Sequence, residues 1–207
     1  MKCLIFTSCL FLIGTILAAD PISFDFADPK GVNTINFNLD AQLEAINGNA
    51  KGVSGRIQFD PEAPHKTTGN LEVDTASMHV SNPLMKEHLH GSQWMEVKKY
   101  PKISFKVTSL GNLSTHGNIT TADVTGELTI KGITREITSS TTLTFLQGKL
   151  KARMGPRGPD GDLLVLRTKF IVNRSDFEIN AGQNTEKVAE EIEISLSLAG
   201  QAPYWTD

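Results

Sequence analysis

Residues Asn82–Phe105 read NPLMKEHLHGSQWMEVKKYPKISF, and this segment indicates more about the fold than any other. It predicts a short helix from Leu84 to Val97 that ends before Tyr100-Pro101, because the residue before a proline disfavours helical backbone. The alternation of Ile103 and Phe105 with polar residues then predicts a strand. Because most of the remaining sequence also has the pattern of strands, the helix is expected to cover one opening of a β-barrel.

Alternation of apolar and polar residues predicts β-strands along most of the chain. It is strict from Thr34 to Glu44 and from Glu191 to Leu198, and the sequence Asn47-Gly48 is typical of a hairpin turn. Further strands are expected at Val53–Phe59, Leu71–Thr75, Ile103–Val107, Val124–Ile130, Leu143–Phe145 and Leu164–Val172. About eight or nine strands separated by turn residues predict an all-β fold, either an antiparallel barrel or a sandwich.

Residues 1–19 have the pattern of a secretory signal peptide, with Lys2, an apolar run at Leu4–Leu17 and small residues at Ala18 and Ala19. The apolar run is shorter than a transmembrane helix requires, although an uncleaved anchor remains the alternative. We therefore expect an exported protein, periplasmic or alternatively secreted, with one domain at residues 20–207.

The composition excludes several classes of function. The 20 basic and 23 acidic residues nearly balance, so binding to nucleic acid or to an anionic membrane surface is not indicated. Both cysteines, Cys3 and Cys9, lie in the predicted signal peptide, so the mature chain would have no disulfide, no cysteine nucleophile and no cysteine ligand for a metal.

Neither catalysis nor metal binding is indicated by a motif. The sequence has no Gly-x-Ser-x-Gly elbow and no phosphate-binding Walker loop, so we expect a protein that is not an enzyme. His88 and His90 are two residues apart, and residues at that spacing do not share a face of a helix. No metal site and no cofactor are therefore expected.

Three segments resemble the YceI-like polyisoprenoid-binding family. They are Lys86–Phe105 with its His-Leu and Tyr-Pro-x-Ile-x-Phe elements, GELTIKGITR at Gly126–Arg135, and VNRSDF at Val172–Phe177. They follow in order, and the resemblance covers essentially the whole predicted mature chain. The chain departs from the family at Lys30–Asn33, where a His-Ser pair is usual, and at Glu178, where glycine is usual; these departures concern the rim of the barrel.

The resemblance implies an extended lipocalin-like antiparallel β-barrel of about eight strands with one short helix segment. It further implies a non-catalytic carrier or storage protein that holds a long isoprenoid lipid, such as a quinone tail or a polyprenyl chain. Transfer of such an apolar chain from water into an apolar tube is favourable by about 25 cal/mol for each Å² of apolar surface that is buried. The lipid head group would then need only a few polar contacts at the mouth. The chain could form a homodimer or bind a membrane protein partner, and the sequence does not decide either.

The candidates for contact with the lipid are the inward residues of the strands and three residues of the predicted helix. They are Phe37, Leu39, Phe59, Leu71, Val73, Leu84, Leu89, Trp94, Ile103, Phe105, Leu128, Ile130, Phe170, Val172, Ile194 and Leu196. For each, the alternative is an ordinary packed core. A β-sandwich that binds another protein, or an enzyme that modifies a lipid inside the barrel, remains the alternative for the whole chain.

For three polar residues we expect a specific structural role. Arg174 and Asp176 lie at a predicted strand end, where a buried Arg–Asp pair would tie the barrel together through bidentate hydrogen bonds. Contact with a lipid head group is the alternative for this pair. The family resemblance implies that His88 joins the helix to the barrel by a hydrogen bond.

Overall fold

The alternating segments form one antiparallel sheet in the computed structural model, which describes residues 20–204. The predicted signal peptide, residues 1–19, and the last three residues of the predicted domain lie outside the described residues. The strands are β1 (Ile22–Asp25), β2 (Thr34–Asp40), β3 (Ala45–Ala50), β4 (Val53–Phe59), β5 (Thr68–Asp74), β6 (His79–Val80), β7 (Lys102–His116), β8 (Ile119–Ile130), β9 (Ile133–Leu146), β10 (Gly161–Asn173) and β11 (Glu191–Pro203). The helices are α1 (Pro83–His90) and α2 (Leu150–Met154), with 3₁₀ turns η1 (Pro64–Lys66), η2 (Thr75–Ser77) and η3 (Ser175–Phe177).

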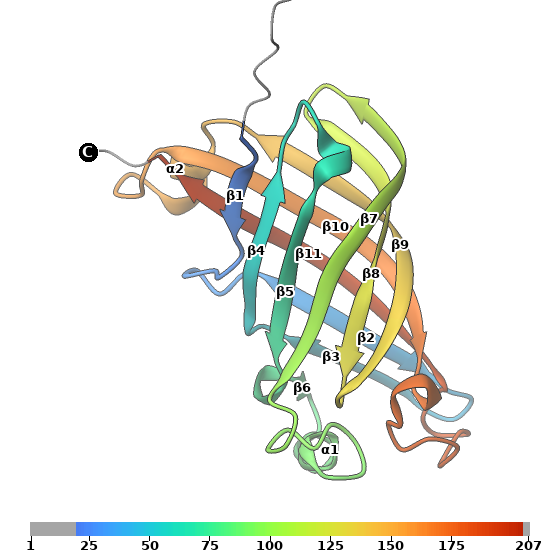
Figure 1. Cartoon of the computed structure of the whole chain (residues 1–207). Helices are drawn as coiled ribbons and strands as arrows, with labels where there is room; N and C mark the ends of the chain where they lie inside the picture. The colour runs from blue at the N-terminus through green and yellow to red at the C-terminus, as the bar shows by residue number, and fades with distance from the viewer. Residues whose placement is uncertain (1–19, 205–207) are drawn as a thin grey trace, which may run out of the picture.

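The sheet closes into a barrel. Its order is β1-β4-β5-β7-β8-β9-β10-β11, and β1 also pairs with β11 through Asp25 and Gln201, which completes a ring of eight strands. β2, β3 and β6 continue the sheet beyond β11 (Figure 1). The predicted all-β, antiparallel barrel of about eight strands is therefore confirmed.

The strand register places alternate side chains inside. Phe105 on β7 lies opposite Leu71 on β5 and Leu128 on β8, so the three side chains share the inner face. The ring of Phe105 packs on Gly126, where the space that a Cβ would need is taken by the ring. This glycine is thus required by the close approach of an aromatic side chain rather than by a turn.

The first hairpin differs from the prediction. β2 ends at Asp40 and the turn lies at residues 41–44, with the amide of Ala41 donating to the carbonyl of Glu44 at 3.0 Å. Asn47-Gly48, predicted as a turn, lies within β3. Gly48 serves a different purpose there, because the ring of Phe37 on β2 packs against it.

The predicted helix Leu84–Val97 is shorter than expected. α1 begins after Asn82, whose side-chain oxygen accepts the amides of Leu84 and Met85 at 2.9 and 3.1 Å, and it ends at His90. Residues 91–99 then form a series of turns, including a hydrogen bond from the amide of Gly91 to the carbonyl of His88. Among residues 20–204, no helix is long and apolar enough to cross a membrane.

Asp28 anchors the loop between β1 and β2 to α2. Its carboxylate accepts the amides of Lys30, Val32 and Asn33 at 3.1, 2.7 and 2.8 Å and lies 3.0 Å from the guanidinium of Arg153. Burial alone raises the pKa of the Asp28 carboxyl. The three amides and the guanidinium outweigh that effect and hold the pKa below its ordinary value.

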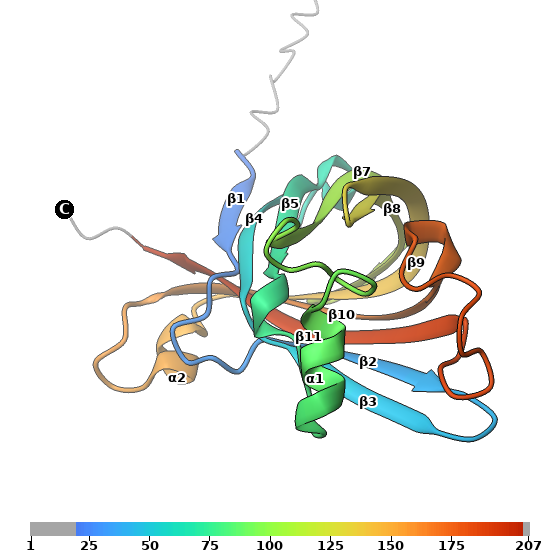
Figure 2. The ribbon, with the colours of Figure 1, turned by 90° about the horizontal axis from the view of Figure 1, so that it is seen from below.

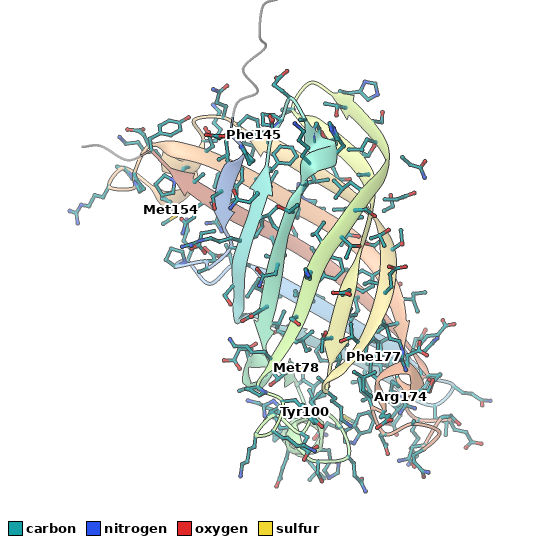
Figure 3. The ribbon with its side chains drawn as sticks, in the orientation of Figure 1. Met78, Tyr100, Phe145, Met154, Arg174 and Phe177 are labelled. Atoms are coloured by element: carbon teal, nitrogen blue, oxygen red, sulfur yellow. The ribbon has the colours of Figure 1, made fainter. Side chains whose placement is uncertain are left out.

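The two ends of the barrel differ. At one end the ring centroid of Phe145 lies 6.2 Å from that of Phe24 and 6.3 Å from that of Phe59, and these three aromatic side chains fill the interior. At the other end lie α1, Tyr100 and Arg174 (Figure 3). We call the end filled by the aromatic rings the closed end, and the end with α1 the mouth.

Candidate functional site

A cavity of about 1050 Å³ occupies the interior of the barrel. Its wall is predominantly apolar and includes residues from β2–β11. At the mouth the wall is completed by α1, the turns at residues 91–95 and the loop at residues 179–188 (Figure 2). The volume lies at the upper end of the range for small-molecule sites, and the shape is that of a tube with one end filled.

The structure places nearly all of the predicted lipid-contacting residues in this wall. They are Phe37, Leu39, Leu71, Val73, Leu84, Leu89, Trp94, Ile103, Phe105, Leu128, Ile130, Phe170, Val172, Ile194 and Leu196. Contact of these side chains with a lipid stays a prediction.

Phe59 does not belong to the wall. It is 1 % exposed and packs against Phe145 in the closed end, beyond the floor of the cavity. Alternation correctly places Phe59 on the inner face of β4. Alternation contains no information on how far along the strand the interior is filled, so it could not show that Phe59 lies outside the cavity wall.

Leu84 lines the cavity at its rim. It was expected to face inward, and its side chain is 60 % exposed. Met95, in the turns after α1, is instead the most buried residue of the segment at 3 % exposure. Because the helix ends at His90, helical periodicity no longer describes the positions beyond it.

Several wall residues were missed by sequence reasoning. The missed residues on the strands include Ile35, Ile46, Ile57, Val107, Val124, Ile192 and Leu198. For all of these except Ile46 the signal is the alternation itself, since each lies two or four residues from a named candidate on the same strand. Ile46 lies on β3, where a turn was predicted instead of a strand. Met78 and Met95 also line the cavity, and no pattern in the sequence marks them.

Arg174 is completely buried beside the mouth and holds the loop that follows η3. Its five N–H groups all point to backbone carbonyls, which are those of Ile179, Asn180, Gln183, Val188 and Ala189, at 2.7–3.3 Å. A guanidinium has only five N–H donors, so none remains for a ligand. The guanidinium also lies 5.6 Å from the ring centroid of Trp94, close enough for a cation–π interaction.

The predicted pair between Arg174 and Asp176 does not form. Asp176 is exposed and accepts the side-chain amide of Asn173 at 3.3 Å, whereas the nearest carboxylate to the guanidinium is that of Glu190 at 3.8 Å. Burial lowers the pKa of Arg174, and the charge of Glu190 acts in the opposite direction. The geometry supports the structural role expected for Arg174 but with backbone acceptors.

The histidines lie at the mouth. His90 makes the connection that was expected of His88, with its Nε2 atom 2.8 Å from the carbonyl oxygen of Met78. His88 contributes to the rim of the cavity. Within residues 20–204, no three His, Cys, Asp or Glu side chains are grouped closely enough to hold a metal ion.

Comparison with known proteins identifies the family. Residues 28–199 match the YceI-like domain. The chain belongs to the YceI-like domain family. It is 27 % identical over 155 residues to a UPF0312 protein of Pseudomonas putida strain F1, which covers 75 % of this chain and 73 % of the relative. It is 24 % identical over 200 residues to protein YceI of Salmonella agona, which covers 94 % of this chain and 93 % of that protein.

Solved structures show the same fold. The structure of BcnA from Burkholderia cenocepacia matches with a TM-score of 0.64 and 22 % identity, over 81 % of this chain and 95 % of that one. A polyisoprenoid binding domain from Saccharophagus degradans matches with a TM-score of 0.64 and 14 % identity, over 88 % of this chain and 99 % of that one. At these identities the likeness establishes the barrel of this YceI-like chain and not its ligand.

Proposed function

We propose that this YceI-like protein is an exported, non-catalytic carrier or storage protein that binds a long isoprenoid chain, of quinone or polyprenyl type, inside its barrel. The observation that carries the proposal is the long apolar cavity of about 1050 Å³ with one end filled by aromatic rings. A flexible hydrocarbon chain gains about 25 cal/mol for each Å² of its surface that such a wall removes from water.

Two further observations support the proposal. The structural neighbour from Saccharophagus degradans is described as a polyisoprenoid binding domain, and its fold is shared over most of this chain. The signal-peptide pattern of residues 1–19 supports export to the periplasm or beyond the cell.

The experiment that tests the proposal is extraction of the purified mature protein with organic solvent, followed by mass spectrometry of the extract. We expect about one isoprenoid molecule for each protein chain. A ligand-free protein that also fails to bind added geranylgeraniol would contradict the carrier and favour a protein-interaction module. Conversion of the added lipid to a new product would instead establish an enzyme.

A further inference from the structure

Three hydroxyl side chains form a polar patch in the cavity wall. Ser139 and Thr141 on β9 and Thr168 on β10 all line the cavity, and Thr168 lies directly opposite Thr141 in the register of the two strands. The Oγ atom of Ser139 lies 3.4 Å from the Oγ1 atom of Thr141, and each residue is 8 % exposed. We call these three residues the hydroxyl cluster.

The hydroxyl cluster is surrounded by apolar wall. Its neighbours on β8 are Ala122, opposite Thr141, and Val124, opposite Ser139, while Leu196 on β11 lies opposite Thr168. Towards the closed end, the next inward residues on the two strands are Leu143 and Leu166. The cluster therefore lies in the inner half of the tube, far from the polar residues of the mouth.

The hydroxyl cluster has spare hydrogen-bonding capacity. Thr168 donates to the carbonyl of Ser140 at 2.8 Å, so its lone pairs remain available to accept. Thr141 donates to the carbonyl of Ser139 at 3.3 Å, and the contact between the Ser139 and Thr141 hydroxyls is 3.4 Å. Both distances are long for an O–H···O bond, which is most often about 2.7–2.8 Å. A ligand atom could thus receive the Ser139 proton and donate to Thr141 or Thr168.

The charges of the wall determine which head group fits. Glu44, Glu87 and Lys187 line the cavity only at the mouth, where their segments lie. Arg174 also reaches the cavity, but its N–H groups are committed to five carbonyls. Among residues 20–204, an anionic head such as a phosphate would find no cation in the inner half of the cavity, and burial of an unpaired charge there costs several kcal/mol. A neutral polar group has no such cost.

We propose that the hydroxyl cluster binds the neutral polar group of the ligand, a hydroxyl, phenol or carbonyl, so that the head lies inside and the isoprenoid tail extends towards the mouth. This inference rests on the proposed function. It differs from the sequence-based expectation that the head group contacts the mouth. Hydrogen bonds inside a low-dielectric tube are stronger than those in contact with water, which favours the interior position. The exposed side chain of Leu84 offers apolar surface at the rim for the tail.

The test compares two ligands on matched variants. The ligands are geranylgeraniol and the hydrocarbon in which its hydroxyl is replaced by hydrogen, and their binding to delipidated protein is measured by displacement of a fluorescent apolar probe. The test variant is Ser139→Ala/Thr141→Val, and the control is Ser140→Ala/Thr142→Val, whose residues alternate with these on the outer face of the same strand. We expect the wild type and the control to prefer the alcohol about tenfold, as one or two buried hydrogen bonds imply, and the test variant to lose that preference.

The outcomes separate this inference from the proposed function. If the wild type binds neither ligand, the proposed function fails. If it binds both equally, the carrier stands and the inference about the hydroxyl cluster is overturned. If Ser139→Ala/Thr141→Val binds the ligands but keeps the full preference for the alcohol, the head group lies elsewhere and the inference is likewise overturned.

Discussion

Replacement of Phe105 by aspartate is the sharpest test of the cavity as a lipid site. The Phe105 ring lies in the wall, packs on Gly126 and shares the inner face with Leu71 and Leu128. The charged residues of the wall lie at the mouth, so the carboxylate of Phe105→Asp would have no cation beside it in the described structure. Without lipid, water in the cavity can solvate the new carboxylate, so the variant is expected to fold.

The magnitude follows from two contributions. Loss of the apolar contact with the ring removes about 1.5 kcal/mol, the lower end of the range for a phenylalanine, because the side chain is only partly buried. Desolvation of the carboxylate by a bound hydrocarbon chain adds several kcal/mol. Together they weaken lipid binding by about 5 kcal/mol, or several thousand-fold in Kd.

The assay measures by mass spectrometry the amount of isoprenoid that co-purifies with each variant. Circular dichroism and urea unfolding establish that the variant is folded. Phe105→Leu, which keeps the wall apolar, and Lys102→Ala, an exposed change at the start of β7, are the controls and should retain lipid. A folded Phe105→Asp protein that still carries about one lipid per chain would refute the assignment of this wall.

Three further predictions concern stability. Arg174→Met should lower the free energy of unfolding by about 3–5 kcal/mol, because five carbonyls lose their donor; a loss below about 1 kcal/mol in urea titration would contradict this role. Gly200→Ala should cost about 1–3 kcal/mol, since the new Cβ would lie 2.5 Å from the Phe26 ring, and Phe26→Leu in the same chain should reduce that cost in a double-mutant cycle. The folded-state pKa of Asp28 is below its unfolded value of 3.8, so its stabilisation is complete above that pH and is lost as pH falls through the folded pKa. Asp28→Asn should therefore be less stable at neutral pH and show a weaker loss of stability in acid unfolding measured between pH 5 and pH 2; an unchanged pH profile would disprove the contribution.

Local patterns in the sequence predicted eight of the eleven strands in residues 20–204 and the inner face of most of them, but they missed β1, β3 and β6. Period-two alternation is a property of each strand by itself, so Phe37, Phe105 and Ile194 could be placed inside without knowledge of their neighbours. The predicted start of the helix, Leu84, lies one residue from the observed start at Pro83. The same local reasoning misjudged the end of the helix, which depends on how residues 91–99 turn against the barrel.

The tertiary structure alone decided where the interior is filled and where it is open. Phe59 and Ile57 have the same alternation, yet the first packs against Phe145 from β9 and the second faces the cavity. The acceptors of Arg174 are backbone carbonyls, which every residue has, so no side-chain motif could mark them. The hydroxyl cluster likewise depends on the register between β9 and β10. These features come from contacts between residues distant in the chain, and such contacts exist only once the strands have paired and the barrel has closed.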